Sequence, residues 1–130
     1  MKHAKTMLYP QEIEVFYIIP SLKKQLAIEL KKTGLKQAQI AKIFHVKEAS
    51  ISQYLSSKRG SLVKFNPCVI QNIKNSVPKI KDAISLLSEI QKLLVIVRNS
   101  GELCRIHKQH SPIPMCCSPK LIGCFENEHK

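Results

Sequence analysis

We predict an all-α fold for this chain of 130 residues. In several stretches the apolar residues recur every three or four positions, which is the spacing of one helix face. No stretch of useful length shows the strict apolar–polar alternation of a half-buried strand. A chain of this size fits one modest domain, or a compact domain of about 65 residues with a second short module.

Two helices are expected before residue 35. Residues 9–12 (Tyr-Pro-Gln-Glu) are typical of a helix start, because proline is tolerated in the first turn and acidic groups favour that end of the helix dipole. We expect Pro20 to end this helix and Ser21 to cap a second one that runs to about Lys32. Gly34 is then expected as the stop that follows it.

Residues 37–55 predict two short helices joined by a tight turn. The apolar residues of the two helices recur at helical spacing; they are Ile40, Ala41, Phe44, Ala49, Ile51, Tyr54 and Leu55. Ile40 and Phe44 of the first helix and Ile51 and Tyr54 of the second are expected to pack together, and Ala49 is expected on the outward face. A helix-turn-helix needs a small residue where its helices cross, and Ala41 occupies that place. Val46 is expected to fill the turn. The same pattern also fits a plain αα-hairpin within a helical bundle.

The segment from Gln37 to Leu55 resembles the DNA-binding motif of the phage-repressor class, the XRE-type regulators that include Cro and lambda repressor. More loosely, residues 9–13, 19–22 and 58–60 extend the similarity to short archaeal regulators with a cysteine-bearing C-terminal tail. The resemblance implies a lambda-repressor-like domain. It also implies that Glu48, Ala49 and Gln53 touch base edges and that Gln37 grips phosphate.

One residue of the motif departs from the family pattern. His45 stands where the family usually has glycine, because the turn there often takes a positive φ angle. Histidine tolerates that conformation better than a branched residue does, so the turn remains compatible with the motif.

The second helix of the 37–55 segment is expected to carry the residues that read DNA. Gln53 is the strongest candidate base reader, because glutamine can pair bidentately with adenine. Glu48 could accept a hydrogen bond from a cytosine amino group, although a carboxylate close to phosphates is otherwise repelled. Lys58 and Arg59 should add salt-dependent affinity rather than sequence choice. The complete predicted DNA-contact set is Gln37, Lys47, Glu48, Ala49, Ser50, Ser52, Gln53, Lys58 and Arg59.

The net charge of +12 indicates a polyanionic partner. Residues 1–66 carry 12 basic and 4 acidic side chains, whereas residues 67–130 carry 9 and 5. The N-terminal half is therefore the expected nucleic-acid face.

The sequence predicts neither a secretory signal nor a membrane span. The only early apolar stretch is broken by Glu14 and bounded by Pro20, and no run approaches the roughly 20 apolar residues that cross a bilayer. We expect a cytoplasmic protein without a membrane partner.

Residues 79–98 form the longest periodic stretch. Its apolar residues are spaced by three or four positions; they are Ile80, Ala83, Ile84, Leu87, Ile90, Leu94 and Val97. Asn66-Pro67 is expected to open the helix before it, and Pro78 to interrupt that helix or mark its end. The long helix could pack on its own domain, or it could join two copies into the homodimer that two operator half-sites require.

The tail that follows concentrates four of the five cysteines. Cys104, Cys116, Cys117 and Cys124 could hold zinc or an iron–sulfur cluster, with His107 or His110 as a substitute ligand. Such a site would order a proline-rich segment that has little core of its own. Redox-sensing thiols and unligated thiols are the alternatives. Cys68 stands apart, near a helix start, and is interpreted as structural.

Together these features predict a sequence-specific DNA-binding transcriptional regulator that is not an enzyme. Its parts would be a helix-turn-helix domain at 1–65, a helical dimerisation segment at 66–101 and a cysteine-bearing tail at 102–130. The alternative is an interaction module that binds RNA or an acidic protein. A cysteine-dependent enzyme in which Cys116 or Cys117 acts with His107 or His110 is disfavoured, because no acidic orienting residue lies near that pair.

Overall fold

The computed structural model describes residues 7–56 and 63–111, and all regular structure in those two ranges is helical, which confirms the all-α class. The α-helices are α1 (Pro10–Ile13), α2 (Ile19–Lys32), α3 (Gln37–Phe44), α4 (Glu48–Leu55), α5 (Pro67–Ser76), α6 (Ala83–Asn99) and α7 (Glu102–His110). A π-helical segment, η1 (Glu14–Ile18), lies between α1 and α2, and a 3₁₀ turn, η2 (Val77–Lys79), follows α5.

The first 23 helical residues form one rod, so the prediction that Pro20 ends a helix is wrong. A proline within a helix removes one backbone donor and crowds the preceding turn. Here the turn before it is a wider π turn, in which the Ile19 N–H donates to the Glu14 carbonyl. That change of register lets the rod continue through Pro20.

Ser21 and Gly34 have different outcomes at the two ends of α2. Ser21 is 3% exposed inside the rod, and its hydroxyl has no hydrogen-bond partner among the described residues, so it is not a helix cap. Gly34 has φ +105°, and its N–H donates to the Lys31 carbonyl over 3.0 Å. The predicted stop after Lys32 is therefore confirmed.

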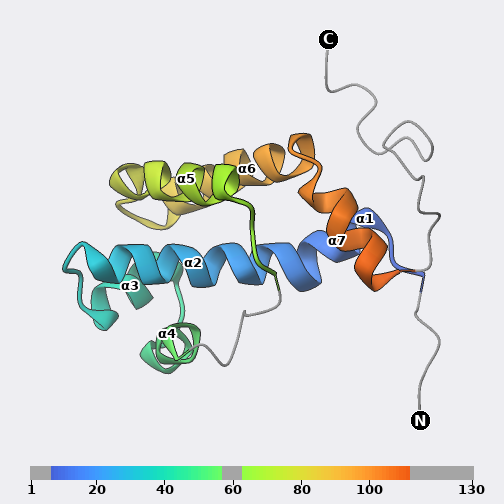
Figure 1. Ribbon diagram of the computed structural model, residues 1–130. Helices are drawn as coiled ribbons and strands as arrows, with labels where there is room; N and C mark the ends of the chain where they lie inside the picture. Colours follow the sequence, from blue (N-terminus) through green and yellow to red (C-terminus); the bar gives the residue numbers. More distant parts are fainter. Residues whose placement is uncertain (1–6, 57–62, 112–130) are drawn as a thin grey trace.

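Helix α2 forms the centre of the molecule. It contacts α3 and α4 on one side and α5 and α6 on the other, and Figure 1 shows these pairs below and above it. Leu22, Leu26 and Ala27 of α2 are fully buried in a single hydrophobic core that includes residues on both sides of position 65. The rod thus holds the α3–α4 pair and the later helices in one packed body.

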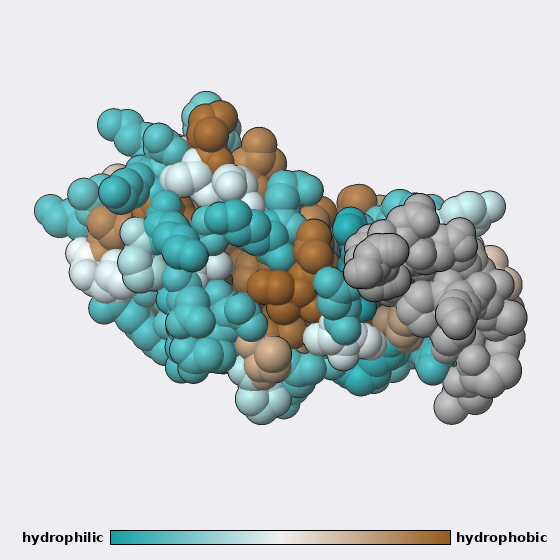
Figure 2. Space-filling model, turned by 90° about the horizontal axis from the view of Figure 1, so that it is seen from above, coloured by the Kyte–Doolittle hydropathy of each residue, from teal (hydrophilic) through white to brown (hydrophobic). Residues whose placement is uncertain are grey.

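Helix α6 contributes only part of its apolar surface to this core. Ile90, Leu94 and Val97 are buried, whereas Ile84 is 73% exposed and Leu87 is 56% exposed. Figure 2 views the side of the molecule that carries α5 and α6 and shows hydrophobic patches among hydrophilic ones. The long apolar stretch therefore packs on its own domain and also leaves apolar side chains at the surface.

Residues 102–110 form helix α7, whereas the sequence predicts that they belong to a proline-rich tail with little core of its own. Leu103 and Ile106 are buried, and α7 contacts α1 and α6. Gly101, with φ +85°, provides the sharp turn between α6 and α7. Two apolar residues are too weak a pattern to predict a helix, and it is the packing against α1 that stabilises it.

Polar contacts fasten the two ends of the described chain together. The Arg98 guanidinium donates to the Glu14 carboxylate over 2.7 and 3.3 Å, which joins α6 to η1. His107 Nε2 lies 2.6 Å from the Leu8 carbonyl oxygen, and the Leu8 N–H donates to Ser111 Oγ over 2.9 Å. The start of the rod is thereby fixed against α7.

A second network anchors the segment that leads into α5. The buried Glu102 carboxylate accepts from Asn66 at 3.2 Å and from Arg105 at 2.6 Å, and Arg105 also donates to the Lys64 carbonyl at 3.0 Å. The pKa of Arg105 is raised above its ordinary value by the hydrogen bond to Glu102. Asn66 also caps α5, since its side chain accepts from the Val69 N–H at 2.9 Å.

Candidate nucleic-acid interface

The interface candidate is the pair of short helices α3 and α4 with the turn between them. The Gln39 side chain accepts the Lys36 N–H at 2.8 Å, which closes the first turn of α3. At its other end His45 adopts a left-handed backbone with φ 57° and ψ 43°. The Val46 N–H then donates back to the Ala41 carbonyl at 3.0 Å. These bonds make the turn short and well defined.

The packing positions expected from the sequence lie inside the pair. Ile40 and Ile51 are fully buried, and Ala41, between the helices, is 5% exposed. The rings of Phe44 and Tyr54 are 6.2 Å apart and tilted, an arrangement that aromatic pairs favour. Because α4 also packs against α2, its orientation is fixed by two neighbours rather than one.

The outer face of α4 is polar and lies away from the rod. Figure 1 shows α4 nearly end-on beneath α2. The predicted DNA-contact residues that are exposed here are Lys47, Glu48, Ala49, Ser52 and Gln53. Ser50 is half-buried, and its N–H donates to the Lys47 carbonyl at 2.9 Å. Of the six candidate residues that the sequence assigned to α4 and its N-cap, five are therefore accessible to a ligand.

A hydrogen bond joins Gln37 of α3 to Ser52 of α4. The Ser52 hydroxyl donates to Gln37 Oε1 over 3.0 Å. With Oε1 engaged, the amide NH₂ of Gln37 is left as the group that can donate to a ligand oxygen. Sequence reasoning named both residues as separate contacts and missed their pairing. The two residues are 15 positions apart on different helices, so no local pattern reveals the bond.

The described residues supply little of the predicted metal site. Cys104 lies half-buried in α7, while Cys116, Cys117 and Cys124 lie outside the described residues. His107 is engaged by the Leu8 carbonyl, and the ring of His110 stacks on Tyr17 at 4.1 Å. Within residues 7–56 and 63–111 no group of three or more His, Cys, Asp or Glu side chains could hold a metal ion.

Two other sequence predictions have a partial outcome. Lys58 and Arg59 lie outside the described residues, so their expected phosphate contacts stay predictions. Cys68 is exposed near the start of α5, where it contacts the Asn72 side chain, rather than in the core. Among the residues that the structure describes, no helix is long and apolar enough to cross a membrane.

Comparisons of this chain with protein-family models, with curated proteins and with solved structures give no match. The likeness of residues 37–55 to phage repressors is therefore carried by the motif itself.

Proposed function

We propose that this protein is a lambda-repressor-like transcriptional regulator that binds duplex DNA by laying α4 in the major groove. The observation that carries the proposal is the outer face of α4, which is exposed and polar on a helix whose inner face is anchored by the fully buried Ile51. The major groove of B-DNA is about 12 Å wide and admits one α-helix. A rigid polar helix at the surface of a basic protein suits that groove.

The residues of α4 would divide into base-reading and backbone-binding roles. Gln53 would read a base edge, and Glu48 and Ala49 would face the neighbouring bases. Lys47 at the start of α4 would bind phosphate, as would Lys58 and Arg59 beyond its end. Ser50 is only half-exposed, which favours a backbone contact over a base contact.

The Ser52–Gln37 hydrogen bond supports a phosphate role for Gln37. The bond directs the Gln37 NH₂ group as a donor, and phosphate oxygens accept such donors. It also ties the first turn of α3 to the reading helix. A contact to the DNA backbone through α3 would thus fix how α4 sits in the groove.

The decisive experiment selects a preferred duplex from a random library and then measures binding by fluorescence anisotropy. We expect Gln53→Ala to weaken binding to the selected duplex by about 1–3 kcal/mol and to leave binding to random duplex nearly unchanged. Gln109→Ala, an exposed glutamine of α7, is the matched control and should change neither.

Equal losses on selected and random duplex for Gln53→Ala would contradict the base-reading role. A library that yields no preferred duplex would contradict sequence-specific binding altogether.

The competing function is an RNA- or protein-binding module, since the same positive charge would attract any polyanion. Competition with structured RNA distinguishes the two functions. A DNA regulator should stay bound to its DNA duplex when an equal mass of structured RNA is added.

The proposal includes a homodimer, which is supported by the exposed apolar surface of α6, and a metal or iron–sulfur site, which is supported by the sequence alone. A homodimer would present two α4 helices to half-sites about one helical turn apart. The exposed Ile84, Leu87 and Val95 of α6 offer an apolar surface for it. We also propose that Cys104 binds a zinc ion or an iron–sulfur cluster together with Cys116, Cys117 and Cys124. Anaerobic purification with metal analysis and an absorption spectrum tests it.

A further inference from the structure

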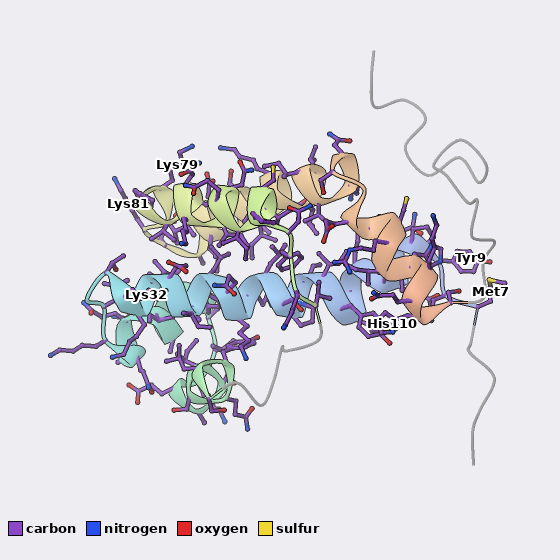
Figure 3. All side chains as sticks on the ribbon, in the orientation of Figure 1. Met7, Tyr9, Lys32, Lys79, Lys81 and His110 are labelled. Atoms are coloured by element: carbon purple, nitrogen blue, oxygen red, sulfur yellow. The ribbon has the colours of Figure 1, made fainter. Side chains whose placement is uncertain are left out.

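Exposed apolar side chains gather where the described chain begins. Four of the seven large hydrophobic residues that are exposed in the described ranges fall within residues 7–16, and the other three lie on α6. We call this surface the apolar end. It consists of Met7, Tyr9, Val15 and Phe16, which are between 52% and 68% exposed. Figure 3 shows Met7 and Tyr9 at the end of the molecule opposite to Lys32. A contiguous apolar patch on a protein surface marks an interaction site.

Two aromatic rings of the apolar end stand on the outside of the rod. Phe16 follows Tyr9 by seven residues, or about two helical turns, so both side chains project from neighbouring parts of one surface. Glu12 lies between them, and its carboxylate is engaged by the Tyr9 N–H at 2.8 Å. Next to Phe16, the ring of Tyr17 stacks on His110 of α7 at 4.1 Å. The apolar end is therefore an aromatic surface that adjoins the end of α7.

The last described residue brings the chain to this surface. Ser111 directly follows α7 and is 1% exposed. Its hydroxyl accepts the Leu8 N–H at 2.9 Å and lies 3.6 Å from Met7 Sδ. Its backbone is extended, with φ −146° and ψ 146°. The chain therefore continues to residue 112 from a point beside Met7.

The residues that follow Ser111 match the apolar end in their chemistry. Residues 112–119 (Pro-Ile-Pro-Met-Cys-Cys-Ser-Pro) hold no charged side chain, in a protein in which 23% of the residues are charged. Proline disfavours helical backbone at the residue before it, so the sequence of 112–115 favours the extended polyproline conformation. Segments of that kind bind surfaces lined with aromatic side chains. Four such residues span about 12 Å, and two helical turns rise by about 11 Å.

We propose that residues 112–115 bind the apolar end of the same chain, with Ile113 and Met115 in contact with Phe16. These residues lie outside the described residues, and the proposal rests on the exposed surface and on where Ser111 delivers the chain. Linkage within one chain favours this occupant over a separate partner, because a short linker gives a local concentration of roughly millimolar order. The inference goes beyond the proposed function and requires neither DNA nor a metal ion.

A tryptophan at position 16 reports whether the apolar end is covered. The chain has no tryptophan, so Phe16→Trp gives a single fluorophore on this surface. We measure its emission maximum and its quenching by acrylamide, with and without Ile113→Ser/Met115→Ser in the full chain. The two serines should shift the emission to longer wavelength and increase the quenching, because serine side chains would no longer hold water away from the indole.

Matched controls locate the contact. Leu121→Ser/Ile122→Ser removes two apolar side chains from a later part of the chain and should leave the emission from position 16 unchanged. Asn75→Trp places the fluorophore on an exposed position of α5, where Ile113→Ser/Met115→Ser should have no effect. Circular dichroism should show the same helix content in all variants, which excludes unfolding as the cause of a shift.

Three results would overturn the proposal. The first is equal quenching at position 16 with and without Ile113→Ser/Met115→Ser. The second is an equal effect of Leu121→Ser/Ile122→Ser, because the contact would then not belong to residues 112–115. The third is protection that increases with protein concentration, which would assign the apolar end to a second copy of the chain. None of these measurements involves DNA, so the failure of this inference and that of the proposed function are distinguishable.

Discussion

His45 is the residue at which the local conformation is most costly. It has φ 57°, and among the described non-glycine residues it alone has a positive φ. The left-handed region is disfavoured for L-amino acids by about 1–2 kcal/mol, and most strongly for β-branched ones. The sequence pointed to this position, because the motif that it resembles usually carries glycine there. The strained backbone is what turns α3 sharply into α4.

Replacing His45 tests this conformation directly. We expect His45→Gly to leave stability unchanged or to raise it by up to about 1 kcal/mol, because glycine adopts the left-handed region freely. His45→Val should lower it by about 1–2 kcal/mol, since a β-branched side chain clashes there. Urea unfolding followed by circular dichroism measures both. Equal stabilities for the two variants would be inconsistent with a left-handed residue in this turn.

Helix α6 is the element whose start is most clearly specified by its own residues. Asp82 accepts the Ser85 N–H at 2.8 Å, and the Ser85 hydroxyl in turn accepts the Asp82 N–H at 2.9 Å, which forms a capping box. The hydrogen bonds from the Ser85 N–H and hydroxyl lower the pKa of Asp82 below its ordinary value of 3.8. The ionised carboxylate is therefore the form that stabilises the helix.

The cap gives stability a specific dependence on pH. A lowered pKa in the folded state means that the contribution of Asp82 is complete above pH 3.8 and is lost as pH falls through the folded value. We expect Asp82→Ala to be less stable than the wild type at pH 7, with a difference that shrinks below pH 3.8. Urea midpoints across this range measure it. Asp82→Asn keeps an uncharged acceptor, and a wild-type pH profile for that variant would refute the assigned cause.

At the scale of the whole molecule, α6 has two apolar faces with different fates. Ile90, Leu94 and Val97 belong to the single core, whereas Leu87 is 56% exposed and Ile84 is 73% exposed on the outside. Dimers bury on the order of 800 Å² on each partner, so a few exposed side chains can form only the centre of such an interface. The proposed homodimer would use this outer face.

Charge placed at the centre of the outer face should separate the copies. We expect Leu87→Glu to convert a dimer to a monomer, as measured by light scattering over a range of concentrations, because a carboxylate would be buried without a partner. Its neighbour Ser88 is also exposed, and Ser88→Glu is the control. Thermal unfolding of the dilute Leu87→Glu protein should resemble that of the wild type, since Leu87 lies outside the core. A monomeric wild type would contradict the proposal.

The sequence by itself determined the features that depend on neighbouring residues. The ends of α3 and α4, the stop at Gly34 and the buried positions Ile40 and Ile51 follow from periodicity and turn chemistry. The polar outer face of α4 follows in the same way, because apolar residues three or four positions apart mark the buried face of a helix and the residues between them mark its outer face. This covers most of the described part of the candidate site.

Only the tertiary structure decided features that depend on distant residues. The rod continues through Pro20 with a π turn, and α7 is stabilised by packing on α1, which no local pattern predicts. The Ser52–Gln37 bond joins residues from different helices. Local propensities set where a helix can begin, but contacts between remote segments determine whether it persists and which surfaces come together.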